Sequence, residues 1–105
     1  METIERTKPV VGNGAHVSNG VDTHSMTIIM VSESGKTVIA QRDSVKPKEG
    51  AKPYSNEWEM TPNTNGATYE FTLRKNGHYI QAGEPMHFGS VLHLSGRREY
   101  YSYEF

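Results

Sequence analysis

Cysteine is absent from this 105-residue chain, so the fold cannot rest on disulfides, and thiolate metal sites and thiol catalysis are excluded. The chain also lacks the roughly 20 consecutive apolar residues that a membrane helix needs. Its first residues carry acids where a secretory signal would carry an apolar stretch. These absences predict a cytoplasmic protein that does not enter membranes.

An excess of charge of one sign is missing as well. Eleven basic residues face twelve acidic ones, which gives a formal net charge of -1. No global field therefore draws the protein to nucleic acid or to anionic lipid, and any such binding must come from a local patch. The length is typical of one domain, and we expect a polar N-terminal arm at residues 1–11 and a single domain at residues 12–105.

Helical periodicity is the next absence, because no stretch of ten residues repeats its apolar positions every 3.6 residues. Short runs of alternating or β-branched residues stand between turn residues instead, and these predict an all-β fold. About six or seven short antiparallel strands favour a small barrel, and we expect the open, SH3-like form. The expected strands are 15–18, 25–31, 37–42, 67–74, 79–82, 91–94 and 97–105, and residues 56–60 alternate as a further short strand.

The strongest local prediction is a hairpin at Asn76-Gly77, a dipeptide typical of two-residue turns. Such a turn pairs Leu73 with Ile80 and Phe71 with Ala82, and so puts apolar side chains on one face. Another hairpin joins the strands on either side of the Gly35 turn. The expected core comprises Trp58, Phe71, Leu73, Ile80, Leu92, Leu94 and several tyrosines.

Residues 43–55 show no strand or helix periodicity and carry two prolines and three lysines, which predicts a long loop. Lys48, Lys52 and Tyr54 on this loop are candidate contacts for a protein partner. The alternation that follows predicts that Trp58 and Met60 share one face. Asn65-Gly66 in the next turn is suited to positive φ angles.

Catalytic motifs are weak. No serine stands in a nucleophile elbow, and we expect no cofactor. Glu57 and Glu59 lie two residues apart on the expected strand opposite Trp58, and so face water. Imidazole binds zinc, but the histidines are scattered without ligand spacing, which leaves a histidine-ligated metal hydrolase as an alternative. The weak metal candidates are His16, His24, His78, His87 and His93.

Arginine beside aromatic residues is how small barrels hold single-stranded nucleic acid, through stacking and phosphate contacts. The alternative is that the tyrosines pack the sheet while the arginines cover its exposed face. The candidate residues in the C-terminal third are Arg74, Lys75, Tyr79, Arg97, Arg98 and Tyr100.

Short runs of turn and strand residues extend along most of the chain: Val11-Gly12-x-Gly14-Ala15, Thr27-Ile28-Ile29-x-Val31-Ser32-x-Ser34-Gly35-Lys36-Thr37, Pro62-Asn63-x-Asn65-Gly66, Phe71-x-Leu73-Arg74-Lys75-Asn76-Gly77 and Gly96-Arg97-Arg98-x-Tyr100. Together they resemble a loose group of small bacteriophage and mobile-element proteins with no established activity. The resemblance implies a phage source and carries over no catalytic residue. The strand order is also similar to that of SH3-like barrels, which bind peptides, protein surfaces or nucleic acid.

The leading hypothesis is a non-enzymatic binding module, encoded by a phage, that binds or inhibits a host protein through the long loop and the aromatic edge. The alternatives are a barrel that binds single-stranded RNA or DNA, the metal hydrolase, and a virion or assembly component. We expect a monomer or a weak homo-oligomer.

Overall fold

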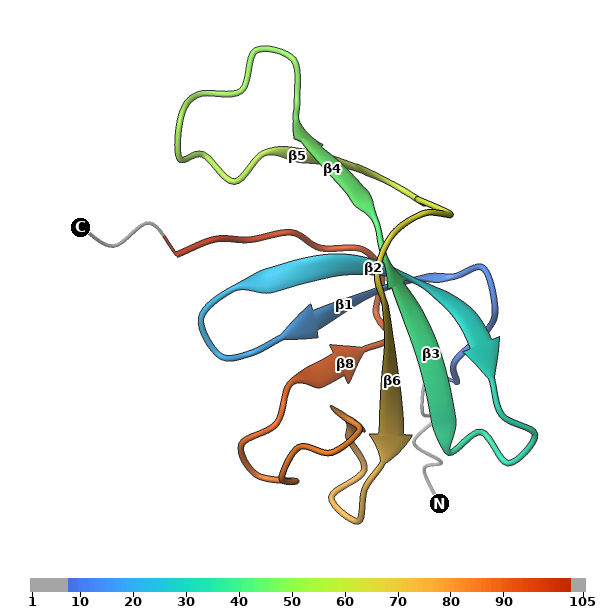
Figure 1. Cartoon of the computed structure of the whole chain (residues 1–105). Coiled ribbons are helices and arrows are strands. Elements are labelled where there is room, and N and C mark those ends of the chain that lie inside the picture. Colours follow the sequence, from blue (N-terminus) through green and yellow to red (C-terminus); the bar gives the residue numbers. More distant parts are fainter. Residues whose placement is uncertain (1–7, 103–105) are drawn as a thin grey trace, which may run out of the picture.

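A computed structural model describes residues 8–102 of the chain. Six strands close into an antiparallel barrel in the order β1-β2-β3-β6-β7-β8, and two more form a separate sheet (Figure 1). No helix occurs in the described residues, so none there could span a membrane. The all-β prediction is confirmed. The strands are β1 Gly14–Ser18, β2 Thr23–Val31, β3 Thr37–Arg42, β4 Ser44–Pro47, β5 Trp58–Thr61, β6 Thr68–Leu73, β7 Tyr79–Gln81 and β8 Val91–His93.

The barrel closes because β1 pairs on both of its edges, with β2 on one side and β8 on the other. His16 lies opposite His93 and Val17 opposite Leu92 in the closing ladder. The sequence predicted an open barrel, whereas the observed barrel is closed. It leaves no long unpaired barrel edge for another strand to join. The SH3-like strand arrangement stays a prediction.

A bulge in β2 shapes the barrel core. The β2–β3 register shifts between Ile28 and Met30, so both Ile28 and Val31 pack inward while Ile29 and Met30 are 40% and 43% exposed. The extra residue lets a strand longer than its partner keep apolar side chains in the core at both of its ends. The core cluster comprises Ala15, Met26, Ile28, Val38, Ala40, Phe71 and Leu92.

The β6–β7 hairpin exists as predicted, but its register is shifted by one residue. Arg74 and His78 bracket a three-residue turn, and Gly77 takes a φ of +83°. Leu73 therefore pairs with Tyr79, and Ile80 pairs with Thr72. A one-residue shift moves a side chain to the other face of a sheet. Tyr79 consequently packs against the barrel core.

Ile80 is fully buried outside that core, beneath the loop of residues 82–90. A Cβ on Gly89 would lie 2.4 Å from Cγ2 of Ile80, so the loop backbone rests directly on this side chain. The prediction that Ile80 shares the face of Phe71 and Leu73 is wrong, although its burial is confirmed.

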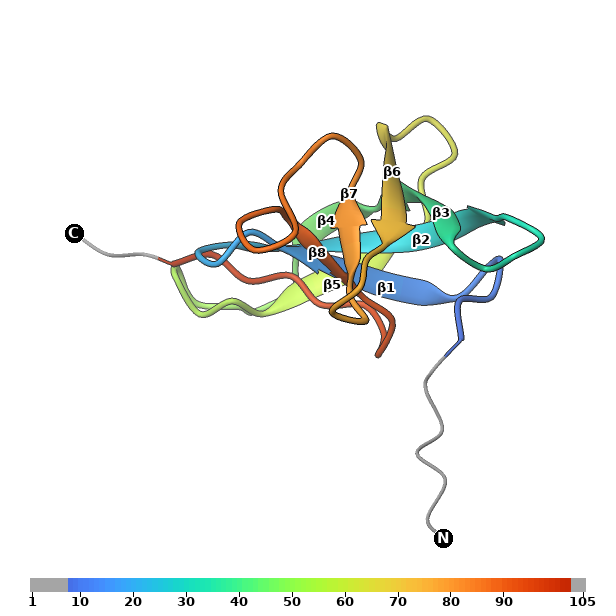
Figure 2. The same ribbon diagram turned by 90° about the horizontal axis from the view of Figure 1, so that it is seen from below.

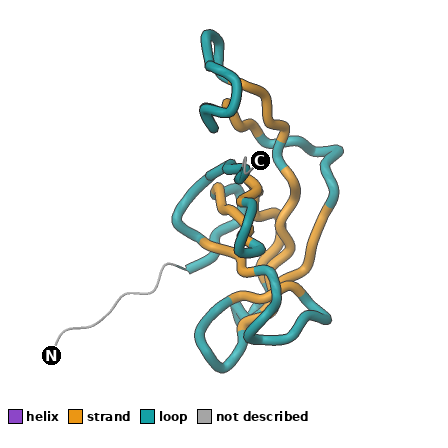
Figure 3. Tube along the Cα trace, turned by 90° about the vertical axis from the view of Figure 1, so that its left-hand side faces the viewer, coloured by secondary structure: helices purple, strands orange, loops and turns teal. Residues whose placement is uncertain are grey.

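Residues 43–55 are not one loop, because β4 pairs with β5 in a hairpin that projects from the barrel (Figures 1 and 3). We call residues 44–61 the arm. The sequence of β4 does not alternate apolar and polar residues, because Val45 is the one half-buried residue of this strand. The strand could therefore not be predicted from periodicity. Trp58 and Met60 share a face as predicted, and Glu57 and Glu59 are exposed.

The turn that leads out of the arm differs from the prediction, because neither Asn65 nor Gly66 has a positive φ. Gly66 is required for a different reason: a Cβ there would meet the carbonyl oxygen of Arg42 at 2.1 Å. The glycine permits a close approach of two backbones rather than a left-handed turn.

The predicted last strand, residues 97–105, is also corrected. Within the described residues this segment forms a single bridge, between Thr23 and Tyr100, and otherwise runs as an extended strap beside β1 and β2 (Figure 2). Its polar groups bond to side chains in place of a ladder: Asn56 accepts from the Tyr101 N–H, and Asp22 accepts from the Ser102 N–H. The predicted shared face of Tyr103 and Phe105 lies outside the described residues, and so do residues 1–7 of the predicted N-terminal segment.

Candidate functional site

Two buried carboxylates anchor the strap to the barrel. Glu99 accepts hydrogen bonds from the Ser25 N–H at 2.8 Å, from both terminal nitrogens of Arg42 at 2.9 and 2.8 Å, and from the Tyr101 hydroxyl. Its side chain has no exposed surface, and the Arg42 side chain is 27% exposed. This is a bidentate ion pair, the strongest common geometry for arginine and a carboxylate.

Asp43 forms the second half of the cluster. Its carboxylate accepts from the Ser25 and Thr27 hydroxyls, both at 2.5 Å, and from Nε of Arg97 at 3.0 Å. Arg97 lies flat over Gly14, where a Cβ would meet Cγ of Arg97 at 2.6 Å. The polar clasp, as we name the cluster, comprises Ser25, Thr27, Arg42, Asp43, Arg97, Glu99 and Tyr101.

The clasp shifts the ionisation of its members. Burial by itself would raise the pKa of Glu99, but hydrogen bonds from Arg42, Tyr101 and Ser25 and the charge of Arg42 outweigh it, so the pKa is lowered. Burial, followed by the hydrogen bond to Glu99 and the charge of that carboxylate, raises the pKa of Tyr101 to about 12. Both shifts favour an ionised Glu99 that accepts a hydrogen bond from the neutral Tyr101 hydroxyl.

Alkaline pH should therefore loosen the strap. A group whose pKa is higher in the folded state contributes stability that is complete below its unfolded pKa of 10 and is lost as pH rises toward about 12. We expect the urea midpoint of unfolding to fall as pH rises from 10 to about 12. In Tyr101→Phe the decrease of the midpoint with pH should be smaller. Some decrease should remain, since burial also raises the pKa of Tyr79. An unchanged decrease in Tyr101→Phe would contradict this assignment.

The hydrogen bonds of the clasp connect the strap to the barrel, and the clasp is saturated by these internal bonds. Within residues 8–102 every buried side-chain nitrogen and oxygen has a hydrogen-bond partner. Ser25 is fully buried, and its hydroxyl donates to Asp43. The clasp groups thus satisfy one another and present no acceptor or nucleophile to a ligand.

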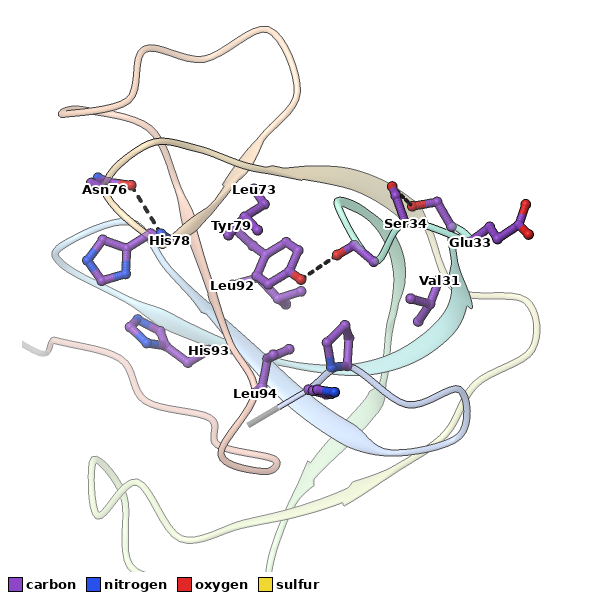
Figure 4. A pocket seen from close by; sticks show the side chains of 15 residues that line it. Val31, Glu33, Ser34, Leu73, Asn76, His78, Tyr79, Leu92, His93 and Leu94 are labelled. Atoms are coloured by element: carbon purple, nitrogen blue, oxygen red, sulfur yellow. Dashed lines mark hydrogen bonds between the residues drawn. The ribbon is translucent and has the colours of Figure 1, made fainter. Parts of the chain in front are cut away.

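A ligand-sized hollow lies at one open end of the barrel, where β2, β6 and β8 end and β7 begins (Figure 4). It encloses about 800 Å³. The Tyr79 hydroxyl donates to the Gly35 carbonyl at 2.5 Å and so joins the β2–β3 turn to its wall. We name it the mouth groove; its lining residues are Lys8, Pro9, Val31, Ser32, Glu33, Ser34, Gly35, Leu73, Asn76, Gly77, His78, Tyr79, Leu92, His93 and Leu94.

Histidines gather beside this groove. The rings of His16 and His93 stack with centroids 4.9 Å apart, and Nδ1 of His16 lies 2.8 Å from the Gly96 carbonyl oxygen. Burial lowers the pKa of His93, and the nearby His16, His78 and Arg98 lower it further. The three imidazoles and Arg98 therefore lie close enough to one another to interact electrostatically.

The other two histidines lie elsewhere. Nδ1 of His24 is 3.5 Å from Glu99, and His87 is exposed on the loop that covers Ile80. Over residues 8–102 no three histidine, aspartate or glutamate side chains are grouped so that they could hold a metal ion. The histidine geometry thus gives the metal-hydrolase alternative no support in this part of the chain.

The predicted binding residues fall into separate places. Arg97 is held by Asp43, and Arg74 donates to Thr72 and to the carbonyls of Glu84 and Gln81, so both stabilise the fold. Tyr79 is in the mouth groove, and the exposed Lys75 and Arg98 are beside it. Lys48, Lys52 and Tyr54 are exposed on the arm, and Tyr100, 43% exposed, is on the strap.

Sequence reasoning missed the groove lining of Val31, Ser32, Ser34 and Gly35, which it assigned to a strand end and a turn. It expected Leu73 and Leu94 in the core; both are half-buried and line the groove, and Leu94 also packs against the core cluster. One signal in the sequence could have indicated the groove. A narrow barrel cannot enclose all the apolar residues at the ends of its short strands, so some of them must line its open end. A smaller cavity of about 250 Å³ occupies the opposite barrel end, beside His24 and Arg42.

Comparison of the chain with protein-family models, with curated proteins and with solved structures gave no match. The resemblance to bacteriophage and mobile-element proteins stays a prediction. The geometry of the chain itself therefore carries the functional argument.

Proposed function

We propose that this protein is a non-enzymatic binding module that holds an extended segment of a protein partner in the mouth groove. The observation that carries the proposal is a hollow of about 800 Å³ with an apolar floor at the end of a closed barrel. Ligand pockets commonly have volumes of 300–1,000 Å³ and often lie in the mouths of β-barrels. The strands fix the floor, so a partner meets a preformed surface.

The kind of contact follows from the closed ladder. A partner cannot extend the barrel sheet by strand addition, because the barrel strands pair with neighbours on both sides. Recognition by the barrel must then come from side chains that enter the hollow. Leu73, Leu92 and Leu94 supply apolar contact, and the exposed Ser34 and Asn76 supply polar groups at the margin.

Nucleic acid is the less favoured ligand. Two of the arginines on which that alternative depended, Arg74 and Arg97, already donate within the fold. The groove floor has one aromatic residue, Tyr79, whereas single strands are held by successive stacked bases. The salt dependence of binding separates the alternatives, since phosphate contacts give a steep loss of affinity with salt.

A random dodecapeptide display library, selected against the purified chain, tests the proposal. We expect enriched peptides with apolar anchors whose affinity falls at least tenfold in Ser34→Trp, which fills the groove from an exposed margin position without altering the core. Leu94→Ser should act in the same direction, with its melting temperature measured alongside.

The matched controls remove exposed aromatic residues elsewhere. Tyr54→Ala lies on the arm and Phe88→Ala, 90% exposed, on the loop of residues 82–90. Both should leave peptide affinity unchanged. Loss of binding in Tyr54→Ala with none in Ser34→Trp would move the binding surface to the arm, and selection of no peptide would remove the proposal.

A further inference from the structure

We infer that the segment held in the mouth groove carries a carboxylate beside its apolar anchor, and that the side of the groove lined by His78 and His93, with the exposed Arg98 nearby, receives it. This inference rests on the proposed function and specifies its ligand. It names the partner chemistry as an acidic, apolar stretch of polypeptide.

The charges around the groove are unequal. Lys8, His78 and His93 line it, and Glu33 is the one carboxylate among its lining residues. The exposed Lys75 directly precedes the lining residue Asn76 in the chain. With the histidines neutral, as in the net charge of -1 for the whole chain, Lys8 and Glu33 balance in the lining, and the positive surplus comes from Lys75 and Arg98 beside it. An anionic ligand complements it.

Among the arginines of residues 8–102, Arg98 is the one left available for such a ligand. Arg42 pairs with Glu99, Arg97 pairs with Asp43, and Arg74 donates to backbone carbonyls. Within residues 8–102 the exposed Arg98 has no hydrogen bond or ion pair, and it lies near His93. A guanidinium in this state can form a bidentate pair with an incoming carboxylate.

The polar clasp holds Arg98 in place. Its neighbours in the chain are both held by the clasp: Arg97 donates to the buried Asp43, and the buried Glu99 accepts from Arg42. The backbone of Arg98 is therefore fixed on both sides while its side chain reaches solvent. Such preorganisation lowers the entropic cost of binding, which favours a specific charge contact over an incidental one.

The two sides of the groove also differ in charge. Figure 4 shows His78 and His93 on one side and Glu33 on the opposite side, with Leu92 and Leu94 between them. A ligand carboxylate is repelled by Glu33 and attracted by the histidine side. An apolar anchor on the leucines thus places its acidic neighbour beside His93.

Peptides from the display library provide the probe. We expect Asp or Glu next to the apolar anchor in the enriched set, and about a tenfold loss of affinity when that Glu or Asp of a synthetic peptide is replaced by its amide. Arg98→Gln should abolish most of the difference between the acidic peptide and its amide. Lys52→Gln, an exposed charge on the arm, is the matched control and should preserve the difference.

Acidification supplies an independent readout. Burial above all, and then the nearby His16, His78 and Arg98, lower the pKa of His93 and so disfavour its protonation. A bound carboxylate reverses this balance, so affinity for the acidic peptide should rise as pH falls from 8 to 6, while affinity for the amide stays level. His93→Gln should flatten the profile.

The outcomes separate the two proposals. Groove-binding peptides without an acidic preference, or an acidic preference that survives Arg98→Gln, would overturn the carboxylate inference and leave the binding module standing. Peptides that ignore the groove would overturn both. Displacement of the acidic peptide by a twelve-nucleotide single-stranded DNA at low salt would assign the cationic side to phosphate and likewise overturn the inference.

Discussion

Replacing Glu99 by glutamine is expected to destabilise the folded protein by about 3 kcal/mol. The substitution keeps the shape of the side chain but leaves Arg42 facing a neutral amide, and removal of one partner of a buried pair typically costs about 3–5 kcal/mol. We take the lower end because the Arg42 side chain is 27% exposed and water can solvate part of its charge. For a domain of this size the melting temperature should fall by roughly 12 °C or more.

The matched control is Glu59→Gln on the arm. Glu59 pairs with Lys46 at 3.6 Å, but the two side chains are 53% and 73% exposed. Exposed pairs contribute about 0–1 kcal/mol, so this variant should melt close to the wild type. Equal losses in Glu99→Gln and Glu59→Gln would show that the strap is not held by a buried charge.

The clasp variant should also affect recognition. Loss of the Glu99 anchor frees the backbone on one side of Arg98, so preference for the acidic peptide should decline even at temperatures where Glu99→Gln is folded. The proposed binding is thus expected to depend on stability, because the strap held by Glu99 also carries the exposed Arg98 guanidinium.

Replacing Ile80 by alanine is expected to destabilise the fold by about 2–5 kcal/mol, the range for truncating a buried isoleucine to alanine. The effect should be concentrated in the loop of residues 82–90, which rests on Ile80 through Gly89. Amide hydrogen exchange in that loop should accelerate well before exchange in β2 and β3. This pattern follows from the observed register, in which Ile80 lies outside the barrel core.

Ile29→Ala is the matched control, since Ile29 has the same side chain but is 40% exposed at the β2 bulge. It should cost less than about 1 kcal/mol. If Ile80→Ala instead accelerated exchange around Phe71 and Val38 and left the loop unaffected, the two-residue turn predicted from Asn76-Gly77 would be the correct one.

The hairpins show what local sequence can specify. Alternation in residues 67–74 and the glycine at position 77 were enough to predict a strand, a turn and a returning strand. They were not enough to choose between a two-residue and a three-residue turn, because a glycine with positive φ suits both. Contacts distant in the chain help to hold the longer turn, including the bonds from Arg74 to the carbonyls of Gln81 and Glu84.

The sequence alone determined an all-β chain with hairpins around Gly35 and Gly77, since these follow from two-residue periodicity and turn chemistry within short windows. The tertiary structure alone decided which polar residues are buried and which cations remain available. Asp43 and Glu99 are far apart in sequence and stand in segments without an apolar pattern. Each carboxylate becomes buried and pairs with an arginine, Asp43 with Arg97 and Glu99 with Arg42, only when the strap crosses β1 and β2. Charge pairing between distant segments leaves no local periodicity, so Arg97 and Arg98 look alike in the sequence and have opposite roles in the fold.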